Sequence, residues 1–350
     1  MPVSKGFAYK KRNDRKIINP KQINLKEFGS ILVIMPVKNA DFITAVPALD
    51  ALKEALPPEG RITAIVSQNT LNLAKACVSI DSTLLVSAAK PLATLGAYIT
   101  VAKSKYQILI NFNDVSVLAF AVGLVSGAAA KISYAPKKET AFYNKVYNLH
   151  LHTINEPQHK IVKYLSLVRF IGANSYDFTP RLKLSEEDKK FACDFFAKNN
   201  ISDSDAVVGI HPSLFDKDKR WAINKYAQLT KLLSEKYGIK VIAVHHPTEK
   251  AAFNEFMHVS RNSAIPIGTY DYVKMTAVAR YMCCFVCNES DFMHVFSPFT
   301  HIIAIWGPTD PEVNKPAGAG HQVLRAADNR ADSVPVSRLT EIVSGLTGRQ

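Results

Sequence analysis

The chain has 350 residues, 47% of them hydrophobic and 21% charged, which is the composition of an ordinary soluble globular protein. This length predicts two domains, since single hydrophobic cores stop growing at about 250–300 residues, and it excludes any need for a disulfide or metal staple. The net charge of +13 favours polyanionic partners such as nucleic acid, an anionic membrane or phosphorylated substrates.

The N-terminal tail, residues 1–27, is polar and basic and lacks the apolar segment of a signal peptide. Its basic residues within the first 22 positions are Lys5, Lys10, Lys11, Arg12, Arg15, Lys16 and Lys21, against Asp14 alone. The simplest interpretation is a solvated tail. The alternative is contact with an anionic membrane surface, where each basic residue contributes about 1 kcal/mol. No recognised nucleic-acid motif follows, so no nucleic-acid partner is expected.

The next part of the chain alternates short apolar runs with longer helical patterns. Strands are predicted at residues 31–35, 61–66, 83–86, 107–110 and 131–134, and helices at residues 42–56, 71–77 and 91–102. Such alternation is typical of βαβ units around a parallel sheet that is covered on both faces. The uncharged stretch 115–130 is shorter than the ~20 residues of a membrane-spanning helix, so a buried helix is predicted there.

A second series of the same kind follows an amphipathic segment at residues 156–171. Its predicted strands are residues 206–210, 240–244, 283–287 and 301–306, and its predicted helices are residues 186–198, 223–237, 248–257, 270–281 and 336–346. The predicted fold class is therefore α/β, with a tail at 1–27, Rossmann-like domains at 28–180 and 181–334 facing a central cleft, and a closing helix at 335–350. In such sheets ligands bind beyond the carboxyl ends of the strands.

The five cysteines are Cys77, Cys193, Cys283, Cys284 and Cys287. Their odd number and irregular spacing argue against a disulfide framework and for a reducing compartment. The spacing of Cys284 and Cys287 alone suggests a zinc or redox site, but no second pair exists and residues 283–287 are an apolar run. Buried thiols are therefore the preferred interpretation, and no metal site is predicted.

Asp41 follows the first predicted strand and opens the first predicted helix. At the carboxyl end of a strand it could act as a general base that takes a proton from a substrate hydroxyl. By position alone, an N-cap role is the simpler explanation, because Asp is favoured at helix starts. Neither a glycine-rich dinucleotide fingerprint nor a P-loop sequence is present, which weakens both of those interpretations.

Two loops of the second half carry groups suited to phosphate. After strand 206–210, Ser213, Lys219 and Arg220 offer a hydroxyl and cations for a diphosphate, although a solvated basic loop fits equally well. Trp221 beside them is expected to be a packing anchor. After strand 283–287, residues 288–294 open a short helix whose N-terminus favours phosphate. Its histidine, taken alone, is better explained as a core residue.

Taken in order, these segments resemble glycosyltransferase family 9, the ADP-heptose:lipopolysaccharide heptosyltransferases, from about residue 30 to residue 346. The resemblance is carried by Ala40-Asp41 with Pro47-Ala48-Leu49, His159-Lys160-Ile161-Val162-Lys163-Tyr164-Leu165, Lys219-Arg220-Trp221, the segment Asn288 to His294, and Gly307-Pro308-Thr309-Asp310-Pro311. Membership implies the GT-B fold, with the acceptor in the N-terminal domain, the nucleotide-sugar in the C-terminal domain, and no metal or cofactor.

The resemblance also implies roles for the matching residues. Asp41 matches the catalytic base, and Lys219 matches a lysine that steadies the diphosphate leaving group. Glu249 matches an acidic residue that contacts the ribose of the donor. Ser213, Glu289, Ser290 and His294 complete the expected donor site. Lys137 and Lys138 are weaker candidates for contact with acceptor phosphates.

The implied reaction is an inverting transfer of a heptose, or a related sugar, from an ADP-sugar to an inner-core lipopolysaccharide-type acceptor. The implied location is the cytoplasm, including the periphery of the inner membrane. Two departures keep an alternative open, since Glu289 replaces the usual Asp and Asp291 replaces a Gly that allows close approach to phosphate. That alternative is a non-catalytic or altered-donor relative that binds a sugar nucleotide or a glycolipid. The missing glycine fingerprint disfavours an oxidoreductase.

Overall fold

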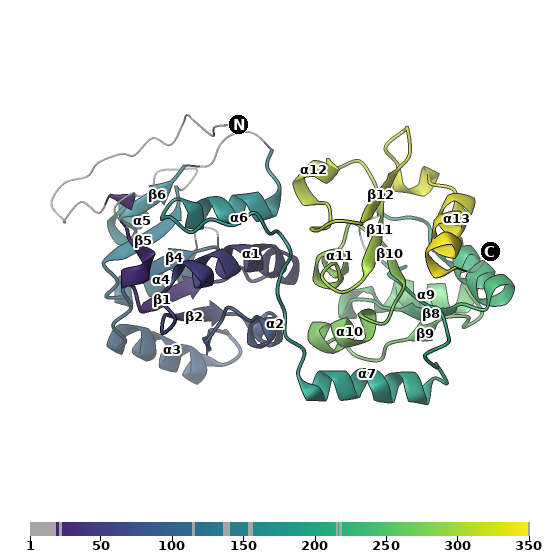
Figure 1. Cartoon of the computed structure of the whole chain (residues 1–350), viewed down its shortest axis with the longest axis horizontal. Coiled ribbons are helices and arrows are strands. Elements are labelled where there is room, and N and C mark those ends of the chain that lie inside the picture. The colour runs from purple at the N-terminus through teal and green to yellow at the C-terminus, as the bar shows by residue number, and fades with distance from the viewer. Residues whose placement is uncertain are drawn as a thin grey trace. The chain divides into compact units, whose positions relative to one another are not determined.

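The structure is a computed structural model that describes residues 19–20, 23–113, 116–135, 141–152, 157–214, 216 and 219–348. The chain divides into two compact units, Met1–Leu182 and Lys183–Gln350 (Figure 1). The boundary predicted after residue 180 falls two residues before this division. Within the predicted tail, Leu25–Glu27 form a short 3-10 helix in which Leu25 is buried.

The first unit contains a six-stranded parallel sheet in the order β3-β2-β1-β4-β5-β6. Its strands are β1 Ser30–Ile34, β2 Arg61–Val66, β3 Ser82–Leu85, β4 Ile108–Asn111, β5 Ala130–Tyr134 and β6 Leu149–Leu151. The central strand β1 is a run of aliphatic residues that is buried from Ile31 onward. Such a run is expected where helices cover both faces of a parallel sheet.

Six helices surround this sheet in the part of the unit that the structure describes. They are α1 Asn39–Ala55, α2 Leu71–Ala76, α3 Pro91–Lys103, α4 Val117–Val125, α5 Ala141–Val146 and α6 Lys160–Arg169. Residues of α3, α4 and α5 form one hydrophobic cluster with β1, β2 and β4, so these helices cover one face of the sheet. Helices α1 and α6 pack side by side (Figure 1). Right-handed crossovers place α1 on the face opposite α3.

The second unit contains another six-stranded parallel sheet, in the order β12-β11-β10-β7-β8-β9. Its strands are β7 Val207–Ile210, β8 Lys240–Ala243, β9 Ile265–Pro266, β10 Cys284–Asn288, β11 His301–Trp306 and β12 Gln322–Arg325. Its helices are α7 Glu186–Lys198, α8 Ile223–Lys231, α9 Lys250–Val259, α10 Tyr272–Ala279, α11 Asp291–Phe296, α12 Pro311–Asn314 and α13 Val336–Thr347. The π-helix Leu232–Lys236 extends α8, and the 3-10 helix Pro247–Glu249 precedes α9.

The two sheets have the same strand order when each is counted from its own first strand. In each unit the order reverses beside that first strand, between β1 and β4 in one and between β7 and β10 in the other. Ligands of doubly wound sheets bind outside the carboxyl ends of the strands at this point of reversal. The fold therefore gives each unit one expected ligand position.

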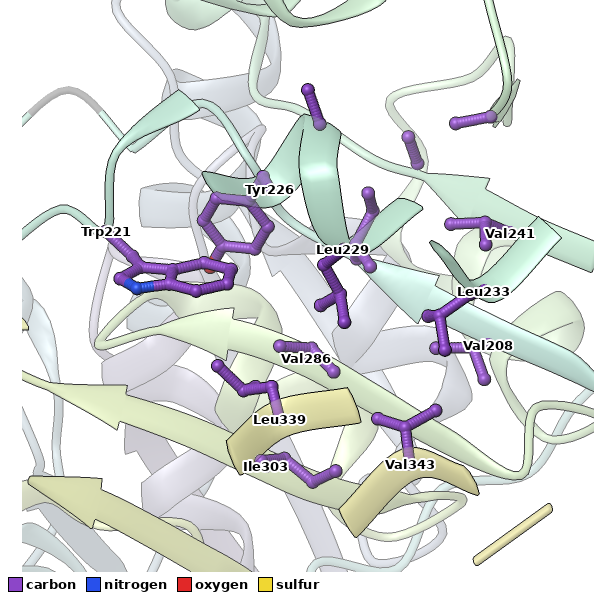
Figure 2. Packing of buried hydrophobic residues seen from close by; sticks show 14 of the residues in the cluster. Val208, Trp221, Tyr226, Leu229, Leu233, Val241, Val286, Ile303, Leu339 and Val343 are labelled. Carbon is purple, nitrogen blue, oxygen red and sulfur yellow. The ribbon is translucent and has the colours of Figure 1, made fainter. Parts of the chain in front are cut away.

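The core of the second unit lies between its sheet and helices α8 and α13. Figure 2 shows Leu229 of α8, Leu233 of the π-helix that follows it, and Leu339 and Val343 of α13, packed over Val208, Val241, Val286 and Ile303 of the strands. Trp221 and Tyr226 lie at one side of this cluster with their rings in edge contact, 4.8 Å between centroids. Trp221 is fully buried, which confirms the packing anchor predicted from the sequence.

Two expectations about burial are wrong. The helix predicted as buried within residues 115–130 is α4, and its residues Val117 and Leu124 are 87% and 59% exposed. In the run 283–287, Cys284 and Cys287 are buried as expected, but Cys283 is exposed. Cys77 is buried and Cys193 is exposed. Burial raises the pKa of the Cys77, Cys284 and Cys287 thiols. Among the residues described, no helix has the length and apolarity needed to cross a membrane.

The sequence patterns also miss short elements. Strands β6, β9 and β12 have two to four residues each, and helices α5 and α12 have six and four. Elements this short hold too few residues to establish a hydrophobic period. Their positions come from pairing with longer neighbours in the sheet and not from local preference.

Candidate active site

Asp41 lies in the first turn of α1, just beyond the carboxyl end of β1. Helix α1 begins at Asn39, three residues earlier than predicted, and its N-cap position is Lys38, which makes no side-chain capping bond. The N-cap explanation of Asp41 is therefore wrong. A carboxylate in the first turn is favoured by the positive end of the helix dipole, and it remains available for other contacts.

The partner of Asp41 is Lys160, the first residue of α6. Its Nζ donates a hydrogen bond to Oδ1 of Asp41 at 2.9 Å. The two side chains are 25% and 36% exposed, so the pair is half-buried and in reach of solvent. The packing of α6 along α1 brings these residues together across 119 positions of sequence.

Asn39 is a second polar residue in this first turn. It is buried, and its Oδ1 has no hydrogen-bond partner among the described residues. Buried polar atoms usually have a partner, and an acceptor without one is suited to a donor such as a hydroxyl. The start of α1 thus combines a paired carboxylate with an unused acceptor.

In the second unit, Lys219 forms an ion pair with Glu289, which follows the last residue of β10. Lys219 Nζ lies 2.8 Å from Oε2 of Glu289. Glu289 also accepts hydrogen bonds from Thr309 Oγ1 at 2.7 Å and from Asn314 Nδ2 at 2.9 Å. Burial by itself raises the pKa of Glu289, but the hydrogen bonds from Lys219, Thr309 and Asn314 outweigh it and lower the pKa overall. Glu289 is therefore charged at neutral pH.

The backbone that carries Lys219 is fixed by Asn288 and Trp221. Asn288 is fully buried, and its Oδ1 accepts a hydrogen bond from the backbone N of Trp221 at 3.1 Å. The indole Nε1 of Trp221 donates to the carbonyl of Val334 at 2.8 Å. These contacts tie the loop after β7 to the end of β10. They place Lys219 beside Glu289 where the strand order reverses.

A second buried carboxylate lies at the carboxyl ends of β7 and β8. Glu249 accepts hydrogen bonds at Oε2 from His211 Nε2 at 2.8 Å, from the backbone N of His246 at 2.9 Å and from Ser213 Oγ at 3.4 Å. Burial alone raises the pKa of Glu249, whereas these partners, His211 foremost, lower it overall. Ser213 is fully buried, so its hydroxyl serves Glu249 in this arrangement.

His294 and Ser290 belong to helix α11. His294 is buried, and its Nε2 donates to Oδ1 of Asn314 at 3.1 Å, which links it through Asn314 to Glu289. Ser290 is the N-cap residue of α11 but makes no capping bond, and its buried hydroxyl interacts with the thiol of Cys287, where it partly offsets the rise in the Cys287 pKa caused by burial. With six residues, α11 is too short for its dipole alone to define an anion site.

Three aromatic rings gather near the end of β8. His245 stacks on Phe253 with 4.1 Å between ring centroids, and Tyr270 meets His245 edge-on at 5.3 Å. Burial lowers the pKa of His245, so this ring is neutral at pH 7. Tyr270 is half exposed. A flat, partly exposed aromatic surface of this kind is suited to stacking with a planar heterocycle.

The structure thus groups the predicted donor residues into two neighbouring sets. Lys219, Glu289 and His294 share one network, and Ser213 and Glu249 share the other. Phe292 of α11, the helix that also carries His294, contacts the ring of His211 with 4.8 Å between centroids. Ser290 belongs to neither set. Lys137 and Lys138 lie outside the described residues. Among the described residues, no group of three or more His, Cys, Asp or Glu side chains is placed to hold a metal ion.

Sequence reasoning missed four residues that contact the predicted ones. They are Lys160, His211, Thr309 and Asn314. Lys160 and Thr309 stand inside the quoted family segments but were given no role. His211 directly follows strand β7, as Asp41 follows strand β1 in the other sheet, and this position at a strand exit is the sequence signal for it.

Both units have the same sheet topology and carry charged side chains near the point where the strand order reverses. A comparison of the sequence with models of known protein families gives a consistent result. The model of glycosyltransferase family 9 (heptosyltransferase) matches residues 99–340. The chain belongs to this family. As a family 9 protein it is a glycosyltransferase, and its two Rossmann-like units give it the GT-B fold.

Solved structures of family 9 proteins have the same fold at low sequence identity. A family 9 glycosyltransferase from Veillonella parvula is 17% identical, with a TM-score of 0.82 over 93% of this chain and 98% of that one. The Escherichia coli ADP-heptose lps heptosyltransferase II is 17% identical, with a TM-score of 0.75 over 91% and 98%. The Escherichia coli heptosyltransferase WaaC with ADP is 15% identical, with a TM-score of 0.72 over 91% and 99%. None of the curated protein sequences compared with the chain matches it significantly.

Proposed function

We propose that the protein is an inverting, metal-independent glycosyltransferase that moves a heptose or related sugar from an ADP-sugar to an inner-core lipopolysaccharide-type acceptor. The observation that carries the proposal is the placement of Asp41 beside β1 and of Lys219 beside β10. Each lies where the strand order of its sheet reverses. One position supplies a base and the other a cation, which are the two groups that this reaction needs.

Asp41 would act on the acceptor. Its carboxylate takes the proton of the acceptor hydroxyl as that oxygen bonds to the anomeric carbon of the donor. The bond from that carbon to the diphosphate oxygen breaks, and its electron pair leaves with the nucleoside diphosphate. Attack from the face opposite the leaving group inverts the anomeric centre. The unused Oδ1 of Asn39 would accept a further hydrogen bond from the acceptor.

Lys219 would act on the leaving group. Its ammonium stabilises the charge that develops on the diphosphate, an electrostatic contribution aimed at the transition state. Glu289 holds this lysine in place through the ion pair and is itself held by Thr309 and Asn314. Because Glu289 is charged at neutral pH, it also competes with the diphosphate for Lys219.

The nucleoside would occupy the ends of β7 and β8. Glu249 is the candidate partner of the ribose, and the rings of His245 and Tyr270 offer a stacking surface for the base. A relative of the same fold, the heptosyltransferase WaaC, has a structure with ADP, which supports an adenine nucleotide as the donor. An acceptor of the proposed kind is a glycolipid. We therefore assign the reaction to the cytoplasmic surface of the inner membrane, where the basic tail would add attraction to anionic lipid.

The proposal is tested by thermal unfolding with a panel of ADP, GDP, UDP and their sugars. A ligand at about one hundred times its Kd stabilises the folded state by about 2.7 kcal/mol. We expect ADP and ADP-sugars to raise Tm, and Lys219→Ala to remove most of the rise. Lys190→Ala is the matched control, since Lys190 also pairs with a carboxylate, Asp194, but both side chains are exposed on the outer side of α7.

The same panel decides between the main proposal and the altered-donor alternative. Stabilisation by GDP or UDP compounds, but not by ADP, would change the proposed donor nucleotide and leave the assignment of the donor-binding residues intact. Stabilisation by ADP with no transfer to a lipopolysaccharide acceptor would favour a binding protein. If no nucleotide or nucleotide-sugar raises Tm, the donor site at Lys219 is wrong.

A further inference from the structure

Helices α3 and α4 of the first unit present an apolar surface to solvent. We call it the α3–α4 surface and define it by six exposed side chains, Leu92, Leu95, Ile99, Val117, Leu124 and Val125. Leu92 and Val117 are 83% and 87% exposed. The two helices pack beside one another on the same face of the sheet, so these side chains come from neighbouring elements.

This surface is not the outer face of ordinary amphipathic helices. From Pro91 to Ala102 of α3, and throughout α4, there is no charged residue. The buried residues of these helices are of small or medium size, among them Ala97 and Val101 in α3 and Ala119 and Val122 in α4. Tyr98, Leu118 and Phe120 pack against the same cluster and are partly buried. Leu92, Leu95 and Leu124 are exposed. A helix that is apolar on all sides is normally buried, and monomers rarely expose large contiguous apolar patches.

The charged residues that lie near α3 and α4 in the sequence are mostly positive. Lys90 is the N-cap residue of α3, Lys103 is its last residue, and Lys105 follows two positions later; all three are exposed. Between Asp81 and Glu139 the sequence has six lysines and a single acid, Asp114. Apolar side chains with lysines at both ends of α3 are complementary to a partner that has an apolar interior and negatively charged groups at its surface.

We infer that the α3–α4 surface is the site at which the protein docks on an anionic phospholipid bilayer. Side chains such as Leu92 and Leu124 enter the boundary between headgroups and acyl chains, and Lys90, Lys103 and Lys105 meet the phosphates. A second copy of the chain fits less well, because a two-fold contact through this surface would bring like-charged lysines together. The inference assigns to α3 and α4 a membrane contact that does not require the basic tail, and it holds whichever sugar the enzyme transfers.

The test is flotation of the full-length protein with phosphatidylcholine vesicles that contain or lack phosphatidylglycerol. We expect binding to the anionic vesicles, and the double variant Leu95→Glu/Leu124→Glu should weaken it by about tenfold or more, since each change removes an inserted leucine and adds a negative charge. The matched control is Val78→Glu. Val78 is 57% exposed, close to the 56% of Leu95 and the 59% of Leu124, but it lies outside the α3–α4 surface.

Lys103→Gln/Lys105→Gln should weaken binding at low salt and remove part of its salt dependence, with Lys75→Gln as the control on α2. Far-ultraviolet circular dichroism and Tm verify that every variant folds. Unchanged flotation of folded Leu95→Glu/Leu124→Glu, or equal loss in Val78→Glu, would overturn the inference. A concentration-dependent dimer that this double variant abolishes, without vesicle binding by the wild type, would assign the surface to a second copy instead. The rise in Tm with ADP, measured on the same variants, reports on the donor site separately.

Discussion

The carboxylates of the two units lie at the carboxyl edges of equivalent sheets but have different surroundings. Asp41 lies after the first strand of its sheet and pairs with Lys160 where solvent reaches both. Glu249 and Glu289 in the second unit are largely buried, and each accepts at least three polar contacts. The topology of the sheet determines the position of a functional group, and the neighbouring side chains determine its burial and its hydrogen bonds.

This difference suits the two roles. An exposed ion pair contributes at most about 1 kcal/mol, so Asp41 can exchange Lys160 for a substrate hydroxyl at small cost. A buried network costs several kcal/mol to disrupt when one partner is removed, so the donor residues keep their geometry. We expect variants of the first unit to change turnover and variants of the second to change donor binding and stability.

The largest expected effect is on turnover in Asp41→Asn. The amide retains the size of the side chain but cannot take the proton, so kcat should fall by about 10²- to 10⁴-fold. Stabilisation by ADP should stay as in the wild type, because Asp41 belongs to the other unit. Steady-state transfer assays and thermal shifts measure the two quantities. Asp194→Asn, which breaks an exposed Asp–Lys pair on α7, is the control, and full turnover in Asp41→Asn would remove the proposed base.

Glu249→Gln should have the next largest effect, on donor binding and stability together. The uncharged amide loses the charge-assisted hydrogen bond from His211, at a cost of about 1–3 kcal/mol. We expect a lower midpoint in urea and an ADP dissociation constant about tenfold higher. Glu341→Gln is the control, because Glu341 forms an exposed ion pair with Arg338 on α13, away from the donor residues. Unchanged ADP binding would contradict the assignment of Glu249 to the donor.

Lys160→Met should have a smaller effect that is confined to turnover. Loss of a half-exposed ion pair costs about 0.2–1 kcal/mol, so kcat should change less than about fivefold, with no change in ADP binding. Lys189→Met, which removes the exposed pair with Glu186, serves as control. A loss of turnover as large as that of Asp41→Asn would mean that Lys160 itself contacts the reacting atoms, and the comparison between the two units would need revision.

The smallest expected effect is on the pH dependence of stability. The folded state lowers the pKa of Glu249 and Glu289 below their unfolded value of about 4.3, so the stability they contribute is complete above that value. It is lost as the pH falls through the folded pKa. Burial also lowers the pKa of His150, His245, His301 and His321, so the stability of the wild type should already decline as the pH falls below about 6.5. In urea unfolding the contribution of Glu289 should appear as a further decline below about pH 4.3, and Glu289→Gln should make that part of the curve shallower. An equally steep decline in this variant would exclude Glu289 as a contributor.

Much of the donor site could be named from the sequence but not assembled from it. Strands of aliphatic residues followed by Asp41, Ser213 or Asn288 predict that these residues gather at the carboxyl edges of parallel sheets. The pairing of Lys219 with Glu289 joins residues 70 positions apart, and no local pattern encodes it. Lys160 was overlooked for the same reason, since only the packing of α6 on α1 brings it to Asp41.

The sequence by itself determined the α/β class, the two sheets, most of the longer elements and the family, because hydrophobic periodicity and motif order are local properties of the chain. Tertiary structure decided the rest. In the folded protein Ser213 and His294 are buried, and Asp41 and Lys219 each form an ion pair. Leu92, Val117 and Leu124 are exposed, although the composition of their helices predicts burial. The physical reason is that the composition of a helix determines how polar it is, whereas its burial depends on how many of its sides are covered by other elements of the fold.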